Sequence, residues 1–192
     1  MSSPDADWGD WNRMAYNDWY DVDEVDNRTG WTVEWKRDPS DASNQGTTVQ
    51  LRTDPDDGYY CKWSKIEQLY NDSVGEVDND YKPYNTSGMT SSGWNVGFDS
   101  DRLVSIGISQ TTSESNLDVN NQSDIDRAED VIHEFDLGGD LKYNTVRVNA
   151  SACMKNVDEM SDTEFVEINL DSKYWGNYWQ SNIDNSYVYK WK

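Results

Sequence analysis

Apolar side chains near the start of the chain recur with the period of a helix. The members of this stripe are Trp8, Trp11, Ala15 and Trp19. Spacings of three and four residues place them on one face of an α-helix, with Ser3 as the capping residue in front of it. Because so large an aromatic face is unstable in water, we expect a helical arm over residues 1–22. This arm would dock on the chain's own sheet or on a neighbouring subunit.

From residue 31 onward the apolar positions alternate with polar ones, which is the period of a half-buried β-strand. The stretch WTVEW shows the pattern, with tryptophan, valine and tryptophan on one face. On the same basis strands are expected at 31–35, 49–51, 59–63, 104–108, 146–148, 165–170 and 187–191. Polar turns at 38–46 and 54–58 separate the first three of these strands.

Two later segments show helical spacing instead. Residues 64–74, SKIEQLYNDSV, predict a short helix, whereas residues 74–93 have few apolar positions and predict a long loop. A central helix is predicted after Ser123, which can cap it, and before two glycines that can end it. The apolar positions of the central helix are Ile125, Ala128, Ile132 and Phe135.

These elements predict an α+β fold. It combines a mixed or antiparallel β sheet with an N-terminal aromatic helix and one central helix, and its second half runs strand, helix, strand, strand. A chain of 192 residues is long enough for one sizeable core. We therefore expect a single domain over residues 23–192, preceded by the arm at 1–22.

The net charge of the chain indicates a protein that works at high salt concentration. Its 37 acidic and 16 basic residues give a formal net charge of −21. At molar salt the screening length falls to about 3 Å and the self-repulsion of such a surface largely vanishes. The 10 Trp and 12 Tyr are too many for a disordered chain. The composition resembles that of haloarchaeal proteins and of the viruses that infect haloarchaea.

The same charge excludes some functions. Sequence-specific nucleic-acid binding needs clustered Lys and Arg, and no basic run exceeds Lys36-Arg37. An acidic wall could still line a passive channel for DNA. No stretch approaches membrane-spanning length, and the opening MSSPDADWGDWN lacks a signal peptide's basic and apolar parts. We expect no membrane association and synthesis in a host cytoplasm, where Cys61 and Cys153 would more often remain free than pair.

Asparagines in Asn-x-Ser/Thr triplets permit glycosylation but do not show it. They are Asn27, Asn71, Asn85, Asn121 and Asn149.

The only histidine, His133, stands beside Glu134 in the expected central helix. This resembles the zinc-binding helix of metzincin-type metalloproteases, in which a second histidine follows one turn later. The corresponding position is Leu137, and the third ligand position is Tyr143. Because the ligand count fails, we expect no enzyme, although a catalytically dead relative stays open as an alternative.

A cation loop is the other candidate for a site. The stretch DVNNQSDIDRAE, 118–129, has oxygen-bearing side chains near EF-hand spacing for a Ca²⁺ or Mg²⁺ ion. Its candidate metal ligands are Asp118, Asn120, Asp126 and Glu129, with an atypical Gln122 between them. Ser123 replaces the required glycine, so acidic residues in a capped helical turn remain the simpler explanation, and no cofactor is expected.

Aromatic clusters such as YWGNYW have two interpretations. They could stack on sugars, which would make the protein a carbohydrate- or surface-binding module that uses Trp175, Tyr178 or Trp179. More often such residues build a core or a subunit interface. The residues expected at an interface are Trp8, Trp11, Trp19, Trp175, Trp179 and Trp191.

The order RLVSIGIS, SDIDRAEDVIHEF, NTVRVNA and DTEFVEINLDSKYW resembles the body of the tail-completion or tail-terminator proteins of tailed viruses. This resemblance covers roughly residues 103–175 and contains no diagnostic motif. It implies a structural component of a haloarchaeal tailed virus particle, located in the virion at the neck or tail. There the protein would form a homo-oligomeric ring and contact other virion proteins.

Overall fold

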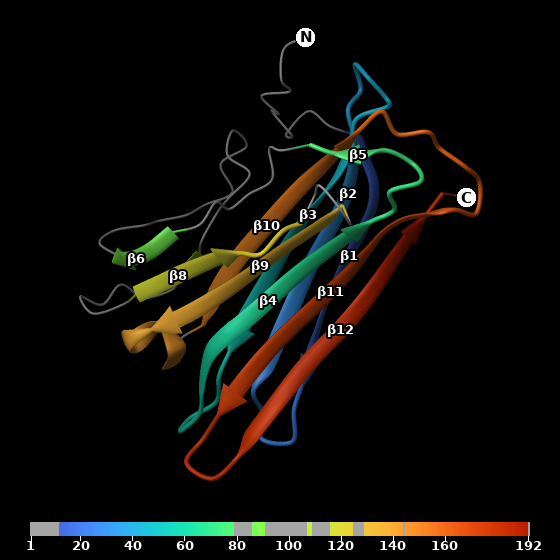
Figure 1. Ribbon diagram of the computed structural model, residues 1–192. Helices are drawn as coiled ribbons and strands as arrows, with labels where there is room; N and C mark the ends of the chain where they lie inside the picture. Colours follow the sequence, from blue (N-terminus) through green and yellow to red (C-terminus); the bar gives the residue numbers. More distant parts are fainter. Residues whose placement is uncertain are drawn as a thin grey trace.

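Two antiparallel six-stranded sheets packed face to face make up the described part of the molecule (Figure 1). The computed structural model describes residues 12–78, 86–90, 107–108, 116–124, 129–143 and 145–191. The long strands of each sheet lie side by side and twist together along the length of the molecule.

The first sheet, sheet A, has the order β1-β2-β3-β10-β5, with β7 also pairing with β10. Its strands are β1 (Asn12–Val22), β2 (Arg28–Arg37), β3 (Gln45–Asp54), β5 (Glu76–Val77), β7 (Gly107–Ile108) and β10 (Val146–Lys155). The first three follow one another in the sequence, whereas β10 joins beside β3 from far along the chain. Within the described residues β1 has a strand partner on one side only, so it is an edge of sheet A.

The second sheet, sheet B, has the order β12-β11-β4-β9-β8-β6. Its strands are β4 (Tyr60–Tyr70), β6 (Thr86–Thr90), β8 (Asn116–Asn121), β9 (Asp130–Gly138), β11 (Glu164–Trp175) and β12 (Gln180–Lys190). A 3-10 turn at Gly139–Tyr143 connects β9 to β10 and thereby carries the chain from sheet B back to sheet A.

The core lies between the two sheets and is rich in aromatic rings. Trp31, Val33 and Trp35 of β2 point inward, as the alternation in WTVEW predicts, and all three are buried. The Trp35 ring stacks on Phe165 of sheet B with 5.0 Å between centroids, and Trp191 closes the cluster at 5.3 Å from Phe165. Burial of rings of this size is the main source of stability between the sheets.

Two buried tyrosine hydroxyls tie the sheets together. The Tyr70 hydroxyl of β4 donates to the backbone oxygen of Ala152 in β10 at 2.9 Å and lies 2.7 Å from Thr47 Oγ1. The Tyr174 hydroxyl of β11 donates to the backbone oxygen of Arg28 in β2 at 2.6 Å. Because the groups are buried, each bond replaces contacts with water and fixes how the two sheets sit on each other.

The predicted α+β class is wrong for the described residues, which contain no α-helix and are almost entirely antiparallel sheet. Residues 12–22 of the expected N-terminal helix form β1. A spacing of four residues fits a strand as well as a helix, because four is a multiple of two, so Ala15 and Trp19 share one face in either case. Residues 1–11 lie outside the described part.

The predicted central helix is also a strand from residue 130 onward. In β9 the side chains of Val131, His133, Phe135 and Leu137 are buried, and those between them face outward. The polar His133 on the buried face hides this alternation in the sequence. Residues 125–128, which include Ile125 and Ala128, lie outside the described part.

The short helix predicted over 64–74 is part of β4 for the same reason. Its inward side chains include Ser64 and Gln68, which are polar but fully buried. Part of the long loop predicted at 74–93 is strand, since β5 and β6 fall within it, and residues 79–85 and 91–93 lie outside the described part.

The strand predictions succeeded better. Strands occur where alternation predicts them at 31–35, 49–51, 146–148 and 165–170. The strand predicted at 59–63 begins at residue 60, and the one predicted at 187–191 holds through residue 190. The strand predicted at 104–108 is described only at β7. Both cysteines are buried and free, as expected, since Cys61 faces the core from sheet B and Cys153 belongs to sheet A.

Candidate functional site

A row of four residues crosses the outer face of sheet A and frames a hollow. Tyr20 of β1 pairs with Gly30 of β2, Gly30 pairs with Arg52 of β3, and Arg52 pairs with Arg147 of β10. All four line a hollow of about 550 Å³. A volume of this size lies within the range of small-ligand sites in proteins.

Gly30 forms the floor of the hollow because it has no side chain. A Cβ atom built on Gly30 would lie 3.7 Å from the Trp19 backbone oxygen and 3.8 Å from the Arg52 Cβ, which are ordinary contact distances. The surrounding structure therefore has room for a methyl group, and neither crowding nor a left-handed backbone requires glycine here. What glycine provides at this position is open space between Tyr20 and Arg52.

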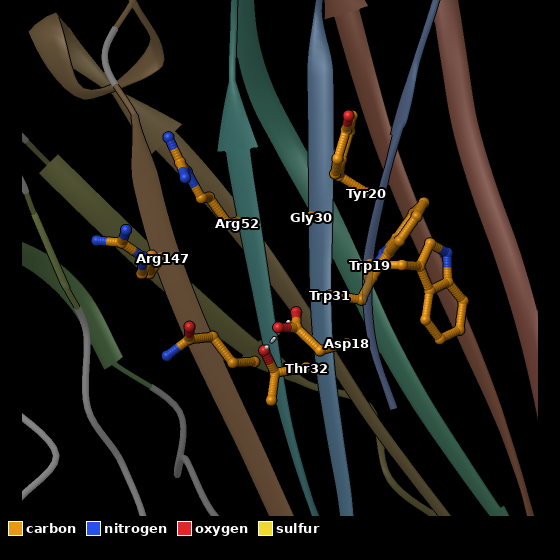
Figure 2. Close-up of a pocket in the computed structure, with 9 residues that line it drawn as sticks. Asp18, Trp19, Tyr20, Gly30, Trp31, Thr32, Arg52 and Arg147 are labelled. Carbon is orange, nitrogen blue, oxygen red and sulfur yellow. Dashed lines mark hydrogen bonds between the residues drawn. The ribbon is translucent and has the colours of Figure 1, made fainter. Parts of the chain in front are cut away.

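The walls of the hollow differ in chemistry. Figure 2 shows Tyr20 on one side of Gly30, with Arg52 and Arg147 on the other. The Tyr20 side chain is 70% exposed, so its ring is available to a ligand. Trp19 and Trp31 also line the hollow, but Trp31 is buried and both rings pack toward the core.

The next row of the sheet supplies uncharged and acidic hydrogen-bonding groups. Asp18, Thr32 and Gln50 pair with one another across β1, β2 and β3 and also line the hollow. The Thr32 hydroxyl donates to Asp18 Oδ1 at 3.3 Å, as the dashed line in Figure 2 marks. These groups lie beside the aromatic wall, so a ligand over Gly30 could contact both.

Only one of the two arginines has an ion-pair partner among the described residues. Arg52 forms an ion pair with Asp54 at 3.0 Å. Among the described residues, Arg147 has no ion-pair or hydrogen-bond partner for its guanidinium group. The row therefore contains a cation without a counter-charge, in a chain with 37 acidic side chains.

A second hollow continues the first along β1 and β2. It has a volume of about 290 Å³, shares Thr32 and Gln50 with the first, and has Tyr16 on its wall. Tyr16 is 45% exposed and lies four residues before Tyr20 on the same face of β1, which places the two backbone positions about 13 Å apart. The Arg13 guanidinium lies 4.8 Å from the centre of the Tyr16 ring. We call the two hollows together the sheet A groove.

The structure does not assemble the predicted cation loop. Asp118 and Asn120 lie on β8, whereas Glu129 accepts a hydrogen bond from the Val77 backbone at 2.5 Å. Asn120 and Gln122 instead donate to Glu134, at 3.4 and 2.7 Å. Asp126 lies outside the described part, and the described residues contain no group of three or more His, Cys, Asp or Glu placed for a metal ion. Strand β8 occupies the first positions of the predicted loop, and residues 125–128 of it lie outside the described part.

The protease-like pair is divided between two faces. His133 is buried and its ring packs against Phe135 at 6.3 Å between centroids, while Glu134 points to the opposite face of β9. A zinc protease needs both side chains on one helix, so the strand removes the geometry on which that alternative depends.

The tryptophans expected at an interface lie in several environments. Trp191 is buried in the core, and Trp19 packs on Tyr187 of β12 with 3.7 Å between centroids. Near the hairpin that joins β11 to β12, Trp175 stacks on Tyr60 at 6.1 Å and Trp179 meets Tyr59 edge-on at 5.8 Å. Trp8 and Trp11 lie outside the described part.

These contacts also bear on the sugar platform expected at YWGNYW. The half-buried rings of Trp175 and Trp179 already have aromatic partners in the chain, and Lys62 lies over Trp175 at 4.9 Å. Only Tyr178 of the cluster is fully exposed.

Among the glycosylation triplets, Asn27 and Asn149 are buried. Asn71 uses its side-chain amide to donate to the Glu164 backbone at 2.8 Å, and Asn121 is half-buried. Asn85 lies outside the described part. Asn27 and Asn149 in the folded chain are therefore inaccessible to modification.

Sequence reasoning missed the sheet A groove. Its residues come from β1, β2, β3 and β10, and nothing in the sequence links Arg147 to Tyr20 before the strand order is known. The one available signal was the single glycine within the alternating strand around TGWTVEW, since glycine inside a strand often marks a close approach or an open position.

No protein-family model matches the chain, and no curated protein matches it. Among solved structures it is similar to Clostridium perfringens delta-toxin, with 12% sequence identity over 89% of this chain and 86% of that chain, and a TM-score of 0.41. In the described part of the chain no helix is long and apolar enough to span a membrane.

Proposed function

We propose that this protein is a non-enzymatic binding module of a halophile or its virus, and that it holds a glycan in the sheet A groove. The observation that carries the proposal is the pair of exposed rings, Tyr16 and Tyr20, along one groove with polar side chains between them. This is the carbohydrate-binding alternative raised by the sequence, transferred from the YWGNYW cluster to another surface.

A sugar suits this combination of groups. The C–H groups on one face of a sugar ring form an apolar surface that packs on an aromatic ring, while its hydroxyls need hydrogen-bonding partners. Tyr20 offers the ring, and Asp18, Thr32 and Gln50 offer carboxylate, hydroxyl and amide groups in the adjacent row. The spacing between Tyr16 and Tyr20 favours an extended chain of sugars over a single small molecule.

The groove is also open along a regular sheet. Its groups are held by paired strands and not by loops, so a ligand would meet them with little loss of backbone freedom. A binding site made in this way needs no nucleophile or general base.

The experiment is a glycan-array screen of the full chain in about 2 M KCl, where surface charge is screened. Hits are then measured with Tyr20→Ala and with Tyr178→Ala as the matched control, since both tyrosines are exposed and lie on different surfaces. We expect binding that Tyr20→Ala weakens about tenfold and that Tyr178→Ala leaves unchanged. No binding to any glycan, or loss only with Tyr178→Ala, would contradict the proposal.

A second proposal is a structural role in a haloarchaeal virus particle, as a subunit that assembles with copies of itself and with other virion proteins. It is favoured by the exposed stripe on edge strand β1, where Met14, Tyr16, Tyr20 and Val22 all face solvent. Edge strands with apolar side chains readily pair with another chain. The narrower assignment to the neck or tail relied on a strand, helix, strand, strand order, and the central helix of that order is β9, so we propose only the broader role.

Molar mass by light scattering in about 2–3 M KCl tests this second proposal. A ring or other closed oligomer that Met14→Asp converts to monomer would support assembly through β1, with Val188→Asp on β12 as the matched control because Val188 is also an exposed apolar residue on an edge strand. A monomer at all concentrations would contradict it.

A further inference from the structure

We infer that the glycan held in the sheet A groove is acidic, and that the carboxylate of a uronic-acid residue binds between Arg147 and Arg52 while its sugar ring lies against Tyr20. This inference rests on the proposed glycan-binding function and specifies the class of sugar. It assigns a recognition role to Arg147 and a spacing role to Gly30.

The Arg147 guanidinium has no ion-pair partner among the described residues. Most described cations already have a partner: Arg13, Lys36, Arg37, Arg52, Lys65, Lys155 and Lys190 pair with carboxylates, and Lys62, Lys142 and Lys173 lie over aromatic rings. Among the described cations Arg28 and Arg147 have neither kind of partner, and of these two only Arg147 lines the hollow. In a chain with more than twice as many acidic as basic side chains, a carboxylate could readily have evolved beside Arg147. The guanidinium is instead left available at the hollow.

Arg147 lies directly beside a second arginine, Arg52. The two residues are direct cross-strand partners on β10 and β3, and such partners have Cβ atoms about 5 Å apart. Like charges placed opposite each other in a sheet are destabilising. Asp54 compensates Arg52 alone, so one bound anion would relieve the remaining repulsion and gain charge-assisted hydrogen bonds from Arg147.

The shape of the arginine side chain and the Tyr20 ring across the gap select the kind of anion that can bind. The guanidinium group presents a planar fork that matches a carboxylate with two parallel hydrogen bonds. On the far side of the Gly30 gap, Tyr20 offers a ring face. A ligand that spans the gap therefore needs a carboxylate at one end and a flat apolar face at the other, and a uronic acid has both on one ring.

The net charge of the protein favours a ligand of low charge density. At −21, the chain repels polyanions such as nucleic acids except where salt screens the repulsion. A glycan in which neutral sugars separate the uronic acids carries few charges, and only the acidic sugar in the hollow needs to meet the arginines. The remaining sugars can extend past Asp18 and Thr32 toward Tyr16.

The test is titration calorimetry of the full chain in about 2 M KCl. The probes are a galacturonic-acid oligomer in which neutral galactose residues separate the acidic ones, the neutral galactose oligomer of equal length, a sulfated galactose oligomer and single-stranded DNA. We expect the galacturonic-acid oligomer to bind about tenfold more tightly than the neutral one, which is the size expected for hydrogen bonds to a charged group. Equal affinity for the acidic and neutral oligomers would overturn the inference and leave the proposed glycan-binding function standing. If neither oligomer nor any array glycan binds, both fail, and preference for the sulfated oligomer or DNA overturns the inference.

Two variants locate the acidic subsite. Arg147→Gln should reduce the affinity for the acidic oligomer about tenfold and leave the affinity for the neutral one unchanged. Arg28→Gln is the matched control, because Arg28 is exposed on the same face of sheet A but does not line the hollow. An equal effect of both variants on the acidic oligomer, or none from Arg147→Gln, would overturn the assignment.

If Arg147→Gln does not fold, Gly30→Val keeps the inference testable. A side chain at residue 30 has room to form and would fill the floor of the hollow, so we expect a folded protein that has lost binding of the acidic oligomer. Unchanged binding by folded Gly30→Val would show that the ligand does not enter this hollow.

Discussion

The side chains that join the two sheets are polar as well as aromatic. Tyr70 connects β4 to β3 and β10, and Tyr174 connects β11 to β2, each through a buried hydroxyl. The Tyr70 hydroxyl contacts Thr47, and the Thr47 hydroxyl in turn donates to Gln68 Oε1; Thr47 and Gln68 are both fully buried. Tyr70 and Tyr174 thus each fix one strand of sheet B against strands of sheet A.

Removal of one such hydroxyl should measurably destabilise the protein. Tyr70→Phe leaves the Ala152 backbone oxygen and the Thr47 hydroxyl with fewer partners in a buried place, so we expect the free energy of unfolding to fall by about 1–3 kcal/mol. Urea unfolding monitored by tryptophan fluorescence would show it. Tyr143→Phe is the control, since Tyr143 is exposed and should change stability by less than about 0.5 kcal/mol.

Stability should also fall at alkaline pH. Burial raises the pKa of Tyr70 and of Tyr174 well above the ordinary value of 10.0, and it raises the pKa of the Cys61 thiol to about 12. In the unfolded chain the pKa is about 8.5 for a cysteine and about 10 for a tyrosine, as for free side chains. Above those values the unfolded state loses protons that the folded state keeps, which favours unfolding.

We therefore expect the free energy of unfolding to be constant between about pH 7 and 8 and to decline above about pH 8.5. The decline should steepen above about pH 10, by up to about 1.4 kcal/mol per pH unit for each tyrosine. Denaturant titrations across this range provide the measurement. If Tyr70→Phe shows the same slope above pH 10 as the unchanged protein, the buried hydroxyl is not the source.

At the scale of elements, the sequence was informative where one face of a strand is apolar throughout. The pattern Trp31, Val33, Trp35 was assigned correctly because nothing polar interrupts it. Strand β9 was mistaken for a helix because His133 lies on its buried face, and β4 because Ser64 and Gln68 do. Gln68, for example, accepts a hydrogen bond from Thr47 of the opposite sheet, and a single strand's sequence does not contain that information.

The candidate site was beyond prediction for a related reason. Its groups become neighbours only through the order β1-β2-β3-β10, in which β10 comes from a distant part of the chain. The sequence predicted that β1 would be helical, which also hid the exposure of Tyr16 and Tyr20. Helical spacing and strand spacing coincide every four residues, so Ala15 and Trp19 could not separate the two.

Gly30 lies inside strand β2, where a residue with a side chain should make the strand more stable. Glycine inside a strand costs about 0.5–1 kcal/mol relative to alanine, and a Cβ at this position meets no atom closer than 3.7 Å. Gly30→Ala should therefore raise the free energy of unfolding by about that amount. The contrasting variant is Gly75→Ala, whose Cβ would lie 2.9 Å from the Lys155 backbone oxygen and should destabilise. Lower stability of Gly30→Ala would mean that the hollow is not free space.

For the whole molecule, net charge decides the conditions of folding. The formal charge of −21 is carried by a chain whose described cations mostly already form ion pairs, so the remaining carboxylates repel one another. Salt weakens this repulsion, with a screening length of about 10 Å at 0.1 M and about 3 Å at 1 M. The aromatic core supplies the opposing attraction.

The melting temperature should accordingly rise between about 0.1 M and 3 M KCl. Differential scanning calorimetry at several KCl concentrations measures this directly. Sodium sulfate, used at lower ionic strength, separates charge screening from strengthened apolar burial, because sulfate acts mainly through the latter. A melting temperature that does not depend on KCl would contradict the view of this surface as an adaptation to brine.

The central claim, that a glycan occupies the sheet A groove, is tested most directly by NMR mapping of amide shifts as a galacturonic-acid oligomer is added in about 2 M KCl. We predict that the perturbed amides cluster at Asp18, Tyr20, Gly30, Arg52 and Arg147, which share one face of four neighbouring strands. Perturbations confined to Trp175, Tyr178 and Trp179 at the hairpin between β11 and β12, or none at saturating oligomer, would contradict it.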